Sequence, residues 1–205
     1  MKIICIGRNY ALHAAELGNA IPEEPLFFLK PDSALQLQKH PFYLPDWSDD
    51  IHYEVEVVIR INRLGKAIEP AFAAKYYAEV GLGIDFTARD VQQRCKEKGH
   101  PWEKAKAFDG SAVVSRDWRP LSDFPAGVQN LNFTLEKNGI PVQTGNTSDM
   151  LFPVDQLIAH VSKYMTLKVG DLLFTGTPAG VGRVVPGDVL EGFLEGARAF
   201  RVQVK

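Results

Sequence analysis

The chain has 205 residues and a formal net charge of −2, with 45% apolar and 23% charged residues. This balance is typical of a globular domain and excludes a disordered chain. The charge excludes the basic excess of a nucleic-acid-binding protein, and no apolar stretch reaches the roughly 20 residues of a membrane-spanning helix. The apolar run at the N-terminus stops at Gly7 and is too short for a signal peptide, and it lacks a small-residue cleavage site. We therefore expect one cytoplasmic domain over residues 1–205 that binds neither nucleic acid nor membrane.

Apolar runs rich in β-branched residues, separated by turns, dominate the chain. In chain order the pattern predicts strand 2–7, helix 10–17 with Asn9 as N-cap, strands 25–31 and 52–61, an Ala-rich helix at 70–78, strand 80–87, helix 87–98 with Thr87 as N-cap, strand 131–139, helix 154–164, and strands 171–178, 188–196 and 197–204. Asn138-Gly139 and Glu195-Gly196 are hairpin turn signals. Because strands do not alternate regularly with helices, the pattern predicts a mainly β, α+β fold rather than a doubly wound parallel sheet.

Glu54 and Glu56 lie two residues apart in the predicted strand 52–61. Strand residues alternate between faces, so these two side chains point the same way. Two adjacent carboxylates repel each other, and a divalent cation such as Mg²⁺, Mn²⁺ or Ca²⁺ removes that repulsion. A solvent-exposed acidic strand face explains the same pattern, although the apolar residues around the pair favour a buried strand. Asp85, which closes the next apolar run, can be a third ligand or can simply cap the helix that follows.

Other polar residues can bind a substrate or transfer a proton. Arg89 and Gln92 are three residues apart on one helix face and suit a bound carboxylate and carbonyl, although a solvated face explains them equally well. Lys106 lies in an apolar setting and can stabilise an anion, but an isolated lysine is more often a surface charge. His13 and Glu16 are also three apart and can activate water as a dyad, or can form a surface pair.

A Gly-rich segment at residues 175–182 follows the predicted strand that begins at residue 171. Backbone N–H groups in such a turn can bind an anion, and the Thr177 hydroxyl adds a donor. The segment matches neither the P-loop nor the dinucleotide-binding fingerprint, and an ordinary tight turn remains the alternative.

The order of these motifs along the chain resembles the fumarylacetoacetate hydrolase family, above all its short single-domain members in the acylpyruvase and oxaloacetate decarboxylase branch. The motifs are Gly7-Arg8-Asn9-Tyr10, His13 with Glu16, Phe28-Leu29-Lys30-Pro31, His52 with Glu54-x-Glu56, Asp85-x-Thr87-Ala88-Arg89-Asp90-Val91-Gln92, Lys106-x-Phe108-Asp109 and Thr175-Gly176-Thr177-Pro178-x-Gly180-Val181-Gly182. One departure is Ala107, where the family pattern has Ser.

The resemblance implies a β-sandwich roll with peripheral helices, usually assembled as a homodimer. It implies that Glu54, Glu56 and Asp85 bind Mg²⁺, with Mn²⁺ or Ca²⁺ as alternatives. It further implies that His13 and Glu16 are a catalytic dyad on a mobile lid helix. Lys106, Arg89, Gln92 and Thr177 then hold a 2-oxo acid and its enolate, and Lys106 is also catalytic.

The activity implied first is hydrolysis of the C–C bond of acylpyruvates, 2,4-dioxo acids such as acetylpyruvate or fumarylpyruvate, through a pyruvate enolate. Decarboxylation or tautomerisation of oxaloacetate is an alternative, as is isomerisation or decarboxylation of 2-hydroxymuconate-type intermediates, because these reactions share enolate chemistry. A non-catalytic metal-binding protein of the same fold is the alternative from a different class.

Overall fold

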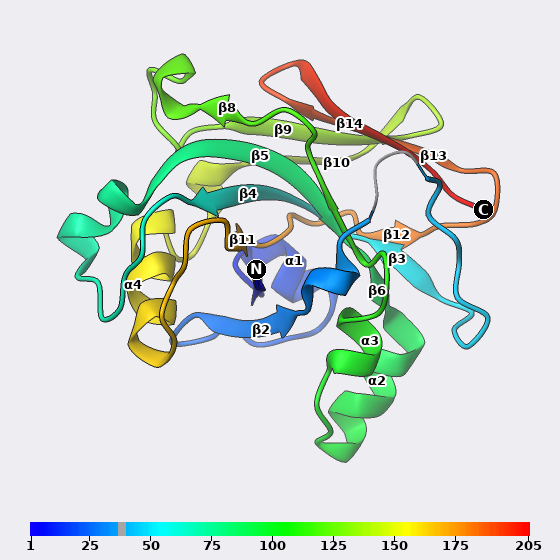
Figure 1. Ribbon diagram of the computed structural model, residues 1–205. Helices are drawn as coiled ribbons and strands as arrows, with labels where there is room; N and C mark the ends of the chain where they lie inside the picture. The colour runs from blue at the N-terminus through cyan, green and yellow to red at the C-terminus, as the bar shows by residue number, and fades with distance from the viewer. Residues whose placement is uncertain (37–39) are drawn as a thin grey trace.

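Strands form most of the fold in the computed structural model, which describes residues 1–36 and 40–205 (Figure 1). The strands are β1 (Ile3–Gly7), β2 (Leu26–Lys30), β3 (Ile51–Tyr53), β4 (Val55–Ile61), β5 (Tyr77–Asp85), β6 (Thr87–Ala88), β7 (Ala112–Val114), β8 (Arg119–Pro120), β9 (Asn132–Lys137), β10 (Ile140–Asn146), β11 (Leu172–Phe174), β12 (Gly182–Arg183), β13 (Val189–Leu194) and β14 (Ala197–Gln203). Every predicted strand is present in some form. The sequence pattern did not identify β7, β8, β10 and β12.

A curled seven-stranded sheet has the order β2-β1-β11-β4-β5-β7, with β8 paired to another part of β5. β1 and β11 pair in parallel, whereas the other neighbours along this sheet pair antiparallel. β11 thus lies between the N-terminal strand and β4, so that the loop after β11 reaches the same end of the sheet as Glu56. A small sheet of order β12-β3-β6 extends the structure beyond β4 and β5.

A four-stranded antiparallel sheet of order β10-β9-β13-β14 covers one face of the larger sheet (Figure 1). Its two hairpins close through the two-residue turns expected from the sequence. Asn138 and Gly139 have φ of 56° and 78°, and Glu195 and Gly196 have φ of 49° and 73°. Positive φ at both central positions matches the twist of the flanking strands, which is why these residue pairs set the hairpin register.

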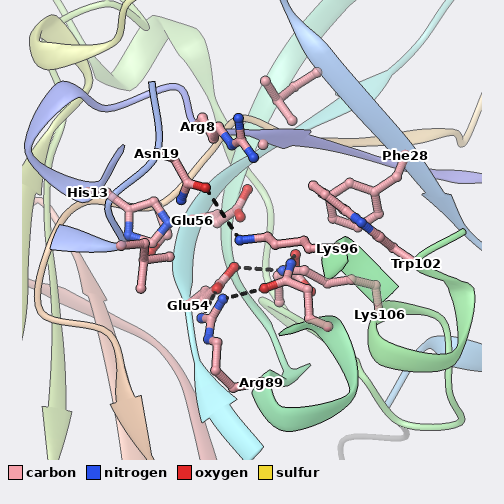
Figure 2. Close-up of a pocket in the computed structure, with 16 residues that line it drawn as sticks. Arg8, His13, Asn19, Phe28, Glu54, Glu56, Arg89, Lys96, Trp102 and Lys106 are labelled. Carbon is pink, nitrogen blue, oxygen red and sulfur yellow. Dashed lines mark hydrogen bonds and ion pairs between the residues drawn. The ribbon is translucent and has the colours of Figure 1, made fainter. Parts of the chain in front are cut away.

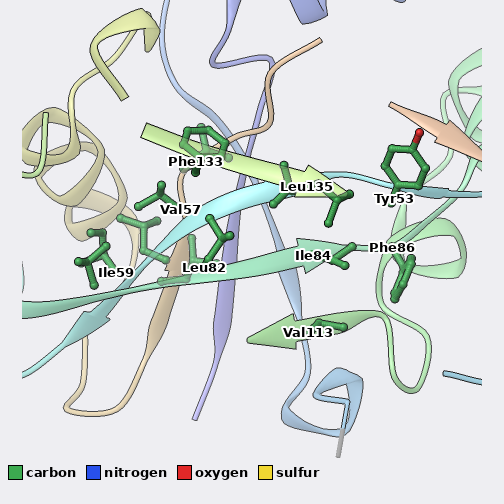
Figure 3. Packing of buried hydrophobic residues seen from close by; sticks show 14 of the residues in the cluster. Tyr53, Val57, Ile59, Leu82, Ile84, Phe86, Val113, Phe133 and Leu135 are labelled. Carbon is green, nitrogen blue, oxygen red and sulfur yellow. The ribbon is translucent and has the colours of Figure 1, made fainter. Parts of the chain in front are cut away.

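The main hydrophobic core lies between these two sheets (Figure 3). Val57, Leu82 and Ile84 of the larger sheet face Phe133 and Leu135 of the four-stranded sheet. A second cluster, which includes Ile3, Cys5, Val58 and Phe174, packs on the opposite face of the larger sheet. The larger sheet is therefore buried on both faces, which explains why its strands read as nearly continuous apolar runs.

Helices lie around the sheets rather than between the strands. The α-helices are α1 (Ala11–Glu16), α2 (Arg89–Lys98), α3 (Glu103–Lys106) and α4 (Val154–Tyr164). The 3₁₀ helices are η1 (Asp32–Ala34), η2 (Pro70–Tyr76), η3 (Leu121–Asp123) and η4 (Thr147–Asp149). Within the described ranges, no helix is long and apolar enough to cross a membrane. The model confirms a mainly β, α+β architecture.

Four local expectations were wrong, and three of them concern single elements or their ends. The Ala-rich segment is the 3₁₀ helix η2 rather than an α-helix, and the strand expected over residues 171–178 ends at Phe174. Thr87 belongs to β6, and Ala88 is the N-cap of α2. The Thr87 hydroxyl instead accepts a hydrogen bond from Lys106 at 2.6 Å, because a buried ammonium attracts it more strongly than a backbone amide does.

Asn9 does not cap α1 either, since Tyr10 is the N-cap. The wholly buried Asn9 side chain accepts a hydrogen bond from Phe152 N at 2.8 Å and donates to Thr175 O at 2.8 Å and Phe152 O at 3.1 Å. It therefore ties the segment before α1 to two segments more than 140 residues further along the chain. All three partners are backbone groups; the hydrogen bond to Thr175 O is fully buried, and the two to Phe152 are partly buried.

Replacing Asn9 with Ala should lower the free energy of unfolding by at least about 2 kcal/mol, because buried backbone groups lose their partners. Urea denaturation measures the change. Asn62→Ala is the matched control: Asn62 is exposed, and the expected change is within about 0.5 kcal/mol. An equal, small effect of both substitutions would show that these three hydrogen bonds do not stabilise the fold.

Candidate active site

Three acidic side chains converge where β4 and β5 meet the small sheet. Glu54 lies between β3 and β4, Glu56 lies on β4, and Asp85 ends β5. β4 and β5 are antiparallel neighbours, and Asp85 N donates to Glu54 O at 2.8 Å. One ligand oxygen from each carboxylate lies within 4.8 Å of the other two. The three residues are only 4%, 2% and 1% exposed, so neither a solvated strand face nor a helix cap explains them.

The strand alternation expected around Glu54 and Glu56 is confirmed. Tyr53, Val55 and Val57 belong to the main hydrophobic core, whereas the two glutamates face the carboxylate cluster. The same apolar residues that bury this strand therefore fix the direction of the glutamates.

Lys106 is a buried partner of the carboxylates and not a surface charge. It is the last residue of α3, and its Nζ lies 2.8 Å from Glu54 Oε2 and 2.8 Å from Asp85 Oδ2. Arg89, the first residue of α2, pairs with the other oxygen of Glu54 and lies 2.7 Å from Gln92 Oε1 through Nη1 (Figure 2). Arg89 and Gln92 thus face the site rather than solvent.

Lys30 is a second buried lysine at the site, and the sequence reasoning did not select it. Its Nζ lies 2.8 Å from Asp85 Oδ1 and donates to Ser111 Oγ at 3.0 Å, to Ser111 O at 3.1 Å and to the Lys106 carbonyl. Lys30 thereby fixes both Asp85 and the end of α3. The available signal was the position of Lys30 inside the apolar strand Leu26–Lys30. A solvated lysine would more often come after the end of such a strand.

The surrounding charges shift the pKa values of Glu54 and Glu56 in opposite directions. Burial alone raises the pKa of Glu54, but the charges of Lys106 and Arg89 outweigh burial and hold that pKa well below its usual range. Burial and the Asp85 charge raise the pKa of Glu56, and the backbone N–H of Gly176, which donates to Glu56 Oε2 at 2.7 Å, offsets only part of this. Burial lowers the pKa of Lys106, but Asp85 and Glu54 more than compensate, so its pKa is raised.

This donor set fits a divalent cation. Three buried carboxylates supply hard oxygen ligands, which Mg²⁺, Mn²⁺ and Ca²⁺ prefer. Glu56, with its raised pKa and no ion-pair partner among the described residues, is the member that gains most from an added positive charge. The geometry is therefore consistent with the ligand set implied by the resemblance.

His13 and Glu16 face each other across one turn of α1. His13 Nδ1 lies 3.5 Å from Glu16 Oε2, an ion-pair distance rather than a well-formed hydrogen bond. Burial lowers the pKa of His13, so its imidazole is neutral at pH 7. Glu16 also accepts a hydrogen bond from Gly180 N at 3.1 Å, which joins α1 to the Gly-rich segment 175–182.

The Gly-rich segment is more than an ordinary turn, because its backbone holds the Glu56 carboxylate. Gly176 has φ of 105°, and a Cβ there would lie 2.7 Å from Asn9 Cβ, so only glycine fits. The Thr177 hydroxyl is buried and accepts a hydrogen bond from Gln143 Nε2 at 2.9 Å. Gln143 lies on β10, a strand that the sequence pattern did not identify, and no local signal marked it.

The three carboxylates, Lys106 and Arg89 border one narrow pocket, which has about 30 Å³ of open space (Figure 2). Every predicted site residue except Glu16 lines it; Glu16 reaches it through His13. Arg8, Asn19 and Lys96, which the sequence reasoning did not select as site residues, also line it, together with Phe28 and Trp102. The open space is close to the volume of one water molecule in the liquid. The mobile lid helix implied by the resemblance stays a prediction.

Replacing Glu56 with Gln should separate metal binding from folding. Without metal the variant should be at least as stable as the native protein, because burial and Asp85 disfavour the charged carboxylate. A metal at 100 times its dissociation constant should stabilise the native protein by about 2.7 kcal/mol. The variant should lose most of this gain, measured by thermal unfolding with Mg²⁺ or Mn²⁺ and then with EDTA.

The control is Glu69→Gln, which changes an exposed glutamate and should leave the metal-dependent shift unchanged. A shift of the same size in Glu56→Gln and in the native protein would place the cation elsewhere.

Comparisons with known proteins agree with this fold and site. The family model described as fumarylacetoacetate (FAA) hydrolase C-terminal matches residues 2–205. The oxaloacetate tautomerase YcgM of Escherichia coli is 42% identical over 195 residues, covering 95% of this chain and 89% of that protein. The mitochondrial oxaloacetate decarboxylase of Dictyostelium discoideum is 44% identical over 191 residues, covering 93% and 87%.

A solved structure is also similar along the whole chain. The fumarylpyruvate hydrolase of Pseudomonas aeruginosa, in complex with Mn²⁺ and pyruvate, has a TM-score of 0.91 and 34% identity and covers 100% of this chain and 89% of that one. The likeness thus includes the curled sheets, the peripheral helices and the segments that carry the carboxylate cluster. The chain belongs to the fumarylacetoacetate hydrolase family and has the α+β fold of its members.

Proposed function

We propose that this protein is a divalent-metal-dependent enzyme that interconverts the keto and enol forms of oxaloacetate. The observation that carries the proposal is the buried cluster of Glu54, Glu56 and Asp85 with Lys106, in a chain whose relatives are named for oxaloacetate chemistry. The sequence analysis placed acylpyruvate hydrolysis first. The relatives' names favour the alternative reading, tautomerisation or decarboxylation of oxaloacetate.

The ion, which we propose to be Mg²⁺ or Mn²⁺, would bind to Glu54, Glu56 and Asp85 and supply Lewis acidity toward the 2-oxo group. Arg89 and Gln92 then offer a guanidinium and an amide to the adjacent C1 carboxylate. Lys106, which is charged because its pKa is raised, supplies positive charge where the C2 oxygen becomes negative as the enol forms.

His13 is the group suited to move the proton at C3. Its Nδ1 faces Glu16, which leaves Nε2 as the ring nitrogen available to the pocket. The low pKa of His13 keeps Nε2 unprotonated at neutral pH, and the Glu16 charge favours the imidazolium that forms when Nε2 takes the proton. Tautomerisation to the enol needs only this removal of a proton from C3 and the delivery of a proton to the C2 oxygen.

Acylpyruvate hydrolysis is the second candidate. It is supported by the likeness to a fumarylpyruvate hydrolase, a protein seen with pyruvate. The same His13–Glu16 dyad would then take a proton from water rather than from carbon. Both reactions place negative charge beside Lys106, so the residues around the carboxylates do not separate them.

Replacing Lys106 with Met should lower kcat for oxaloacetate tautomerisation by about 100-fold or more, because the developing enolate loses its nearest cation. The conversion is followed by the ultraviolet absorbance of the enol, and release of pyruvate from oxaloacetate, acetylpyruvate and fumarylpyruvate is followed in parallel. Lys104→Met, an exposed neighbour on α3, is the control and should keep full activity. Thermal unfolding shows whether the Lys106→Met protein is folded.

Two results would contradict the proposal. Native tautomerase activity that persists after complete metal removal with EDTA would exclude the metal-dependent mechanism. Faster turnover of acetylpyruvate or fumarylpyruvate than of oxaloacetate would make hydrolysis the main activity.

The pH dependence should report His13. Because burial lowers its pKa from 6.5, the neutral form persists below pH 6.5, and the acid limb of kcat/KM should lie below that pH. Glu16 raises the pKa of His13, so Glu16→Gln should move the acid limb to still lower pH. The profiles are measured at saturating metal. Identical acid limbs in the native protein and in Glu16→Gln would exclude His13 as the titrating base.

Two expectations from the sequence remain predictions. The cytoplasmic location is one; the Dictyostelium relative is named as mitochondrial. The homodimer is the other, and light scattering on the purified protein would test it.

A further inference from the structure

The pocket contains four long cationic side chains, which fall into two groups. Arg89 and Lys106 are paired with Glu54, and Lys106 also with Asp85. Arg8 and Lys96 line the same pocket, yet neither forms an ion pair with any carboxylate in the described ranges 1–36 and 40–205. Two of the four cations are therefore compensated by ion pairs, and the other two are not.

Lys96 is placed so that its charge is only partly compensated. It lies on α2, two turns after Arg89, and is half-buried. Its Nζ has a long hydrogen bond of 3.4 Å to Asn19 Oδ1, a neutral acceptor. Burial and the nearby Arg8 charge lower the pKa of Lys96, and Glu54 offsets only part of this. A bound anion would relieve the cost of holding this ammonium beside Arg8.

Arg8 lies opposite α2, in the segment between β1 and α1. Its φ is 59°, a left-handed conformation that residues other than glycine rarely adopt. Figure 2 shows Arg8 and Asn19 on the side of Glu54 and Lys106 opposite to Arg89, with Lys96 extending between these two sides. Arg8 thus places its guanidinium on the side of the pocket opposite to Arg89.

We propose that Arg8 and Lys96 bind the distal carboxylate of the substrate and make the enzyme selective for 2-oxo acids that carry a second negative charge. This rests on the proposed function, in which the ion held by Glu54, Glu56 and Asp85 would act on the 2-oxo group, and Arg89 and Gln92 bind the C1 carboxylate. The remaining carboxylate of oxaloacetate then meets the two unpaired cations. An acylpyruvate with an apolar tail, such as acetylpyruvate, would leave both cations without a partner, whereas fumarylpyruvate carries a distal carboxylate and would satisfy them.

The kinetic test compares oxaloacetate with its 4-methyl ester, which has the same carbon skeleton and a neutral tail. Lys96→Gln should raise KM for oxaloacetate about 10- to 100-fold, the loss expected for one charge-assisted hydrogen bond, with little change in kcat. It should leave KM for the ester nearly unchanged. Lys96→Arg, which keeps the charge, should restore most of the affinity for oxaloacetate.

Lys98→Gln is the matched control: it removes an exposed charge two residues further along α2 and should change neither KM. Arg8→Gln should act like Lys96→Gln, with its fold checked by thermal unfolding because of the left-handed backbone at this position. Equal losses for oxaloacetate and the ester in Lys96→Gln, or no loss for either, would overturn the proposal.

A binding experiment separates this proposal from the proposed function. If the native protein does not turn over oxaloacetate, the proposed function fails, but calorimetry with Mg²⁺ still tests the two cations. The probes are oxalate, which lacks a distal carboxylate, and 2-oxoglutarate, which has one. Lys96→Gln should weaken 2-oxoglutarate binding about 10-fold or more and leave oxalate binding unchanged. Equal weakening of both, or of neither, would overturn the distal site.

Discussion

Burial of three carboxylates within a few ångströms of one another is the constraint on which the rest of the structure depends. Such a cluster persists only if positive charges are buried with it. Lys30, Lys106 and Arg89 supply them from β2, α3 and α2, three elements that have little else in common. The small helices and the edge strand are therefore placed by charge compensation as much as by hydrophobic contact. A divalent ion would extend the same compensation to Glu56.

The sequence predicted those parts of the fold that depend on local patterns. Alternation around Glu54 and Glu56, the two hairpin turns and the stripe of helix 154–164 each involve residues within a few positions of one another. The misses depend on partners far along the chain. Asn9 bonds to residues 143 and 166 positions away, and Lys30 bonds to one 76 positions away. Local sequence periodicity does not indicate such contacts. Asn9 was therefore predicted as a helix cap although its side chain links distant segments, and Lys30 was not predicted as a site residue.

Two questions about the chemistry can be considered separately in the pocket: which residues suit enolate formation, and which could determine the reaction that follows. The end formed by the carboxylates, Lys106 and Arg89 suits any reaction that passes through the enolate of a 2-oxo acid. Tautomerisation, decarboxylation and hydrolysis all satisfy that description, which explains why relatives with different names share this architecture. On the proposed function, differences between these reactions arise elsewhere: in what His13 can reach from α1, and in the positive charge that Arg8 and Lys96 place in the pocket.

The dispersed origin of the buried lysines has a consequence for how the chain folds. If β4 and β5 pair before β2 and α3 have docked, Glu54 and Asp85 are enclosed without Lys30 and Lys106, and uncompensated charge of this kind costs several kcal/mol. We therefore expect partly assembled states to be sparsely populated. On this argument the buried charges favour cooperative folding of this half of the molecule, in which its strands and helices form and are lost together.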